Sequence, residues 1–286
     1  MKTRLQGILE RVRRRGKWLR RRAAEGKAPA GMGQGRRPAG RIIGVLNYKG
    51  GTGKTTTVVN LAAGLARRGA RVLCIDLDAQ GGLATSLNVS FNHTVADLLL
   101  GRADLPECIV PARENLDLIP SDRSLLEAEG ELWRAGESAR DRLEERMAGL
   151  EGYDFILIDY SPSISLVGEC GLRYNREVIV PVAMEYLGLV GTRQVIETLQ
   201  EIDARTDHAV RLSLIVPTFY DARQRMAREV LELLRRYFGE RVAEPIRASV
   251  KLAEAASHGM TIFEYAPESP GAVDYTRLVE RVTSGD

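Results

Sequence analysis

Two lysines bracket three glycines in the run Lys49-Gly50-Gly51-Thr52-Gly53-Lys54-Thr55-Thr56. The run follows apolar residues 42–46 and precedes apolar residues at helical spacing, so strand, loop and helix are expected in that order. Glycines let the backbone approach phosphate closely, and the N–H groups of the loop and the helix start then point at one anion. A glycine turn without a ligand would leave both lysines unexplained. The run therefore predicts a phosphate-binding loop, in which Lys54 reaches the β- and γ-phosphates and Thr55 coordinates Mg²⁺.

Three carboxylates follow apolar runs elsewhere in the chain. Asp76 and Asp78 end a run that begins near residue 71, and Asp159 ends the run over residues 155–158. Side chains two residues apart on a strand point the same way, and parallel strands bind ligands at their carboxyl ends. Beside phosphate and Mg²⁺, the first two could order metal-bound water and the attacking water, and Asp159 could hold Mg²⁺ through water. Solvated loop aspartates are the alternative reading of Asp76 and Asp78.

Alternating strands and helices predict an α/β fold, with a doubly wound, mostly parallel sheet and helices on both faces. Further helices are expected over 94–100, 226–238 and 271–283, and over 121–147 with bends near Gly130 and Gly136. The expected strands cover residues 42–46, 71–75, 116–120, 155–158, 177–182, 212–216 and 242–246. In this arrangement the glycine loop and the three aspartates all fall at the carboxyl ends of strands.

The positive charge of the chain is concentrated at its start. Residues 1–41 hold 14 Lys and Arg against two Asp and Glu, whereas the remainder holds 27 against 36. Within residues 3–24 a stripe of apolar side chains recurs at helical spacing among arginines, with Trp18 beside it: Leu5, Ile8, Leu9, Val12 and Leu19. The segment predicts a basic amphipathic helix that binds nucleic acid or anionic lipid, and a solvated tail with incidental leucines is the alternative.

Glycines and prolines between residues 26 and 40 predict a flexible linker, so we divide the chain into an arm at 1–40 and a folded domain at 41–286. The sequence contains no apolar stretch long enough to span a bilayer, and its basic start lacks the apolar core of a secretory signal. Cys74, Cys108 and Cys170 are odd in number and far apart. Their spacing favours buried thiols in a cytoplasmic protein over a disulfide framework or a zinc site.

The glycine loop departs from the general Gly-x-x-x-x-Gly-Lys-[Ser/Thr] pattern, because Tyr48 stands where the first glycine is required. Its form Lys-Gly-Gly-x-Gly-Lys-Thr-Thr resembles the deviant loop of the ParA/MinD family of Walker-type ATPases. Residues 76–82 also resemble the family, with Ala79 in place of the usual proline. Residues 250–259 resemble another family segment, with Lys251 in place of arginine and Ala256 in place of proline. In the segment 160–163, which resembles the family's switch segment, Ser161 replaces the first proline. The resemblance covers residues 41–283.

The resemblance implies an ATPase with ATP and Mg²⁺ as cofactors. It implies that Lys49 crosses a dimer interface to the partner's nucleotide, that Asp78 positions the hydrolytic water and that Asp76 supports the metal shell. Pro217 and Phe219 match a loop that lies against the adenine, with packing of a strand end as the alternative. Arg223 and Lys251 match positions that family members use to bind DNA, with clustered surface charge as the alternative.

The resemblance is greatest to the chromosome- and plasmid-partitioning branch. It implies a nucleoid-associated homodimer that forms with ATP, binds DNA without sequence preference and is stimulated by a ParB-like partner. A membrane-surface positioning ATPase with a MinD-like role, anchored by residues 3–24, is the competing interpretation. A reductase like the nitrogenase iron protein would need paired cysteines at a dimer axis, and the surroundings of Cys108 and Cys170 lack that pattern.

Overall fold

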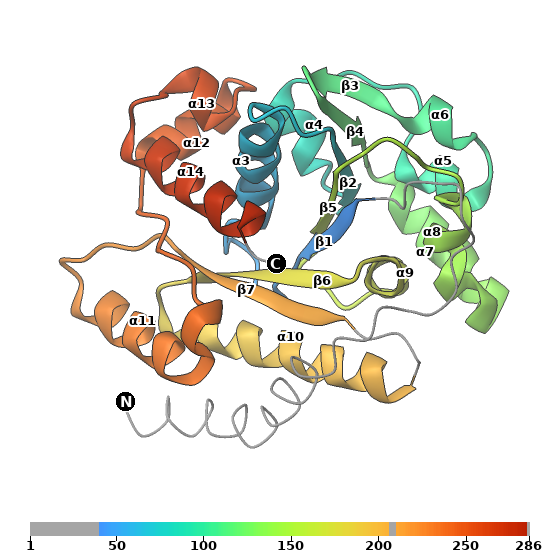
Figure 1. Ribbon diagram of the computed structural model, residues 1–286. Coiled ribbons are helices and arrows are strands. Elements are labelled where there is room, and N and C mark those ends of the chain that lie inside the picture. Colours follow the sequence, from blue (N-terminus) through green and yellow to red (C-terminus); the bar gives the residue numbers. More distant parts are fainter. Residues whose placement is uncertain (1–39, 206–209, 285–286) are drawn as a thin grey trace.

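The computed structural model describes residues 40–205 and 210–284 (Figure 1). The predicted arm and nearly all of the linker lie outside the described residues. The middle layer is a seven-stranded sheet in the order β3-β4-β2-β5-β1-β6-β7. All neighbouring strands are parallel except the edge pair β3–β4. The strands are β1 (Arg41–Val45), β2 (Val72–Leu77), β3 (Val110–Arg113), β4 (Leu116–Ile119), β5 (Phe155–Tyr160), β6 (Glu177–Ala183) and β7 (Arg211–Thr218).

Helices cover both faces of the sheet, which confirms the predicted doubly wound α/β fold (Figure 1). One core lies under α3 (Lys54–Ala66), α4 (Gly82–Leu87), α12 (Val250–Ser257), α13 (Ile262–Tyr265) and α14 (Pro270–Thr283). The second core lies on the opposite face, under α5 (Val95–Leu100), α6 (Leu105–Cys108), α7 (Ser124–Ala135), η1 (Gly136–Asp141), α8 (Arg142–Arg146), α9 (Leu166–Tyr174), α10 (Tyr186–Arg205) and α11 (Arg225–Phe238). A short turn, η2 (Gly239–Arg241), follows α11.

Burial on both faces explains why the central strands are almost continuously apolar. Every residue of β2 and β6 is buried, as expected for strands of a parallel sheet that helices cover on both sides. The three cysteines are free and buried, as the sequence predicts.

Two local predictions are wrong. Residues 242–246 form no strand and make only isolated contacts beside β7, such as the bridge between Ile215 and Val242. Pro245 lacks the N–H that a continuous ladder requires. The predicted bend at Gly130 is also absent, because α7 runs through it, whereas Gly136 ends that helix with a φ of 76°.

The edge strand β3 was not predicted from the sequence. Its four residues include Pro111 and alternate poorly between apolar and polar side chains. Proline is tolerated at the edge of a sheet, where one side of the strand has no ladder partner.

Candidate functional site

The loop between β1 and α3 has the backbone geometry of an anion cradle. Gly51 and Gly53 adopt φ angles of 71° and 84°, in the left-handed region that side chains disfavour. A Cβ atom added at Gly50 or Gly51 would meet nothing within 4 Å, so this side of the loop faces open space. Gly53 caps α3 without a side-chain hydrogen bond. The N–H groups of the first turn are therefore available to an anion.

Thr55 and Asp159 meet at the start of α3. The Thr55 hydroxyl donates to Asp159 Oδ2 over 2.6 Å, and the carboxylate is 1% exposed. Asp159 Oδ1 is buried and has no hydrogen-bond partner among the described residues. Burial, followed by the charge of Asp76, raises the pKa of Asp159 well above its usual range. A buried carboxylate oxygen without a partner, beside a hydroxyl, fits the oxygen ligands that Mg²⁺ prefers.

Lys54 lies beside these groups and is 7% exposed. Burial lowers the pKa of its ammonium, and the charges of Asp159 and Asp78 oppose that shift. A buried ammonium at the open face of the glycine loop is positioned to neutralise phosphate.

Asp76 and Asp78 have different environments, although the sequence places them side by side. Asp76 is fully buried, and its two oxygens accept the backbone N–H groups of Asp78 and Leu83, each over 3.0 Å. Burial raises the pKa of Asp76 to about 7. Asp78 is partly exposed and, among the described residues, accepts only the N–H of Gln80, over 3.1 Å. Asp76 therefore holds the loop that presents Asp78, and Asp78 keeps oxygen atoms free for water.

Strand register brings the carboxylates together. Asp159 is paired with Val45 of β1 on one side and with Asp76 of β2 on the other. The three strands end at the same edge of the sheet, where the phosphate loop begins.

Lys49 is bound within its own chain. Its ammonium forms an ion pair with Glu185, which follows β6, and its N–H donates to Asn47 Oδ1 over 3.0 Å. Asn47 is fully buried and donates from Nδ2 to the carbonyl of Pro181 over 2.7 Å. Sequence reasoning missed both Asn47 and Glu185. The available signal for Asn47 was a polar residue directly after the apolar run 42–46 and before the glycine loop.

The last residue of β7 and the residue after it contact the phosphate loop. Thr218 donates from its hydroxyl to the carbonyl of Thr52 over 2.9 Å, and the Phe219 ring would lie 3.7 Å from a Cβ added at Gly53. Phe219 is 54% exposed, with a φ of 52°. Pro217 is buried within β7, and its carbonyl accepts the N–H of Ile246 over 2.8 Å. Of the two residues expected at the adenine, Phe219 therefore has the exposed ring.

The expected DNA contacts and the switch segment show local pairing. Arg223 forms an ion pair with Asp221 and Lys251 with Glu254, both over 2.9 Å. The Ser161 hydroxyl, at the position where the family has proline, lies 2.9 Å from the Ser163 hydroxyl. Ser161 therefore closes this turn with a hydrogen bond, where a proline ring would restrict φ.

A glycine loop, a buried lysine and a threonine–aspartate pair at the carboxyl edge of a parallel sheet define a P-loop ATPase fold. Residues 40–212 match the family model described as an AAA domain. The chain is 42% identical over 243 residues to the chromosome-partitioning ATPase Soj of Thermus thermophilus, covering 85% of this chain and 95% of the relative. It is 32% identical over 254 residues to the chromosome partitioning protein ParA of Caulobacter vibrioides, covering 85% and 94%. The chain belongs to the ParA/Soj family of chromosome-partitioning ATPases and is an ATPase.

Solved structures show the same fold. Cobyrinic acid a,c-diamide synthase from Mycobacterium smegmatis, with a bound ATP analogue and magnesium, is 30% identical with a TM-score of 0.74, covering 86% of this chain and 95% of that one. MinD from Pyrococcus horikoshii, complexed with Mg-ADP, is 26% identical with a TM-score of 0.71, covering 85% and 95%. Among residues 40–205 and 210–284, no helix has the length and apolar character needed to cross a membrane.

Proposed function

We propose that this chain binds ATP with Mg²⁺ at the phosphate loop and hydrolyses it to drive the partitioning of a chromosome, plasmid or other cargo. The observation that carries this proposal is the unpartnered Asp159 oxygen, which lies beside Thr55 at the open glycine loop. The names of the Thermus and Caulobacter relatives support the partitioning role.

Each residue of the site has a role in this proposal. The N–H groups from Gly50 to Thr56 cradle the phosphates, and Lys54 neutralises their charge. Thr55 and Asp159 hold Mg²⁺, which when bound stabilises negative charge on the phosphates. Asp78 orients the attacking water, and Asp76 supports the loop around it. Phe219, two residues after Pro217, stacks on the adenine.

The ATP-bound form in this proposal is a homodimer. Lys49 exchanges its ion pair with Glu185 for the partner's nucleotide, so that each site is completed by the other protomer. Glu185 is exposed, so little packing opposes the exchange.

The dimer binds DNA without sequence preference, and a ParB-like activator stimulates its ATP hydrolysis. Because it binds DNA, the dimer is located on the nucleoid in the cytoplasm. Arg223 and Lys251 would exchange their acidic neighbours for phosphate oxygens. The basic arm at 1–40, attached to the ATPase domain at 41–286, adds positive charge for the same polyanion.

A membrane-surface role is the second candidate, because the arm joins Trp18 and a leucine stripe to its arginines. Sedimentation with anionic liposomes, compared with retention on random-sequence DNA, separates the two roles. With ATP and Mg²⁺, the full chain is expected on DNA, as a dimer by light scattering. Liposome binding without DNA retention would transfer the proposal to the membrane surface.

A further inference from the structure

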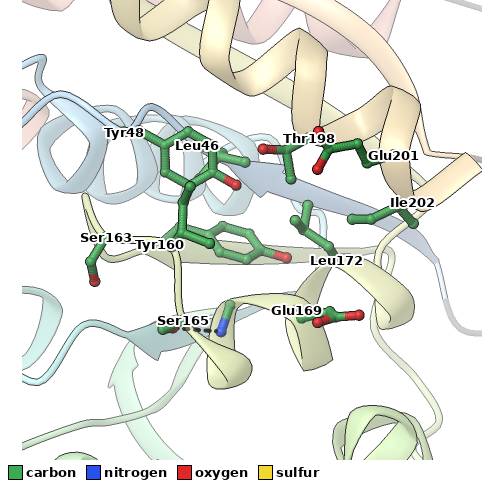
Figure 2. A pocket seen from close by; sticks show the side chains of 12 residues that line it. Leu46, Tyr48, Tyr160, Ser163, Ser165, Glu169, Leu172, Thr198, Glu201 and Ile202 are labelled. Atoms are coloured by element: carbon green, nitrogen blue, oxygen red, sulfur yellow. Dashed lines mark hydrogen bonds between the residues drawn. The ribbon is translucent and has the colours of Figure 1, made fainter. Parts of the chain in front are cut away.

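A cavity of about 140 Å³ lies between the segment that follows β1, the end of β5, α9 and α10, on the face of the sheet opposite α3 (Figure 2). Its apolar lining comes from Leu46, Leu172 and Ile202 and from the rings of Tyr48 and Tyr160. An apolar cavity of about 150 Å³ is large enough to bind benzene. This cavity therefore has room for one large apolar side chain.

One polar group in the lining has no partner. Tyr160 is 1% exposed, and its hydroxyl makes no hydrogen bond with any residue that the structure describes. The hydroxyl lies against α9, because a Cβ added at Gly171 would approach it to 2.7 Å. Leaving a buried hydroxyl without a hydrogen-bond partner is unfavourable for folding. An N–H group or a water carried into the cavity by a ligand would remove that cost.

The rim of the cavity is acidic. Glu169 and Glu201 both line it, from α9 and α10, and Figure 2 shows their carboxylates to one side of the Tyr48 ring. Glu169 has ion pairs with Arg140 at 2.9 Å and Arg173 at 3.7 Å, whereas Glu201 is exposed and has no ion pair within the described part of the chain, so Glu201 supplies the uncompensated charge. An apolar cavity with an acidic rim is the complement of a large apolar side chain flanked by arginines.

We propose that residues 3–24 of this chain dock on the cavity, with one large apolar side chain inside it and arginines against Glu201. The arm carries apolar residues and Trp18 among arginines, which is the chemistry that the cavity and its rim select. The match to the family model begins at residue 40, so this segment lies outside the region that matches.

The length of the linker permits this docking. The described chain begins at Gly40, next to the start of β1, and the cavity lies at the other end of that strand, about 17 Å away at 3.3 Å per residue. Residues 25–39 are rich in glycine and proline, and a flexible chain of that length spans about 20 Å on average. Tethering at this distance gives an effective concentration in the millimolar range.

Docking would link the arm to the nucleotide site. Tyr48 immediately precedes the phosphate loop, and Ser163 and Ser165 of the cavity wall belong to the turn after β5. Arginines held at Glu201 are also unavailable to a polyanion. The docked and polyanion-bound arms therefore exclude each other, although docking itself does not depend on the proposed ATPase cycle.

A photo-crosslinker in place of Trp18 tests the proposal in the full-length chain. Trp18→p-benzoyl-phenylalanine keeps a large aromatic group in the arm. On irradiation we expect crosslinks at the mass of one chain, mapping by mass spectrometry to residues 163–172 and 198–202, with a yield unchanged by tenfold dilution. Crosslinks between two chains, crosslinks only to other surfaces, or none at all would overturn the proposal.

A charge reversal tests the acidic rim separately. Glu201→Arg in the crosslinker background should lower the intramolecular yield at least about fivefold, because two like charges then meet at the rim. Glu268→Arg changes another exposed carboxylate, in the loop between α13 and α14, and should leave the yield unchanged. Equal yields in the two variants would show that the rim does not recognise the arm.

Discussion

At the scale of single residues, the site is defined by charge that is buried without full compensation. One oxygen of Asp159 accepts the Thr55 hydroxyl, and the other has no partner in the described residues. Leaving such an acceptor unsatisfied costs about 1–3 kcal/mol, more for a charged group. Lys54 is also buried, and its environment lowers the pKa of its ammonium. These costs are expected where a ligand later supplies the missing partners.

The role of Lys54 gives the first prediction. Lys54→Ala removes a charge-assisted contact to phosphate, so the affinity for ATP should fall about 10- to 100-fold. Isothermal titration calorimetry with ATP and Mg²⁺ measures the change. Lys251→Ala, which removes an exposed and ion-paired lysine, is the matched control. ATP affinity unchanged by Lys54→Ala would show that the loop is not the phosphate site.

Asp78 gives the second prediction, which separates hydrolysis from binding. Asp78→Ala should retain ATP binding and lower the turnover about 100-fold or more, because the attacking water loses its orienting carboxylate. Phosphate release under saturating ATP measures the rate, and light scattering should show a persistent dimer. Asp122→Ala is the control at an exposed aspartate near the same edge. Normal turnover in Asp78→Ala would assign the water to another group.

At the scale of elements, one carboxylate joins the amino ends of three strands. Glu177 opens β6 and is 5% exposed. It accepts hydrogen bonds from Arg41 at the start of β1 and from Arg211 at the start of β7, over 2.8 Å and 3.1 Å. Burial alone would raise the pKa of Glu177, but hydrogen bonding and charge from these arginines, Arg41 first, reverse that effect and leave its pKa below the usual value.

Glu177→Gln should therefore weaken the sheet. We expect the free energy of unfolding at pH 7 to fall by about 1–3 kcal/mol. This loss is smaller than that for a fully buried ion pair, because both arginines are partly exposed. A lowered folded pKa stabilises the protein above the unfolded pKa, and this contribution disappears as the pH falls through the folded value. Urea unfolding at pH 7 and pH 3.5 should thus show a smaller difference between wild type and variant at the lower pH. Glu268→Gln is the surface control, and a difference independent of pH would contradict the charge-based account.

At the scale of the whole molecule, the sequence predicts local structure such as strands and the residues at their ends. It does not predict the contacts between segments that are far apart along the chain. The buried strands and the carboxylates Asp76 and Asp159 could be predicted, because apolar runs that end in aspartate are local patterns. The ion pair of Lys49 with Glu185 could not, since it joins residues 136 positions apart through the pairing of β1 with β6. The opposite environments of Asp76 and Asp78 likewise depend on how α4 packs after β2.

The pairing of Lys49 with Glu185 bears on assembly. In the proposed site Lys54 serves the phosphates within one protomer, so a second lysine at the mouth of the loop would be redundant there. Across a two-fold interface it would neutralise charge on the partner's nucleotide. In the single chain Glu185 holds this lysine, so the proposed dimer would exchange one ion pair for another.

Lys49→Ala should accordingly keep measurable ATP binding while losing hydrolysis and ATP-dependent dimerisation. Lys49→Gln should behave in the same way, because an amide carries no charge. Glu185→Gln is the matched variant: it frees the lysine at the other end of the ion pair and should still dimerise with ATP. Light scattering, phosphate release and retention on random-sequence DNA provide the three measurements, and DNA retention should fall with the dimer.

Deleting residues 1–39 shows whether the arm contributes, since a core that still binds DNA with ATP would make the arm auxiliary. A Lys49→Ala protein that dimerises and hydrolyses ATP normally would leave each protomer with a complete site of its own.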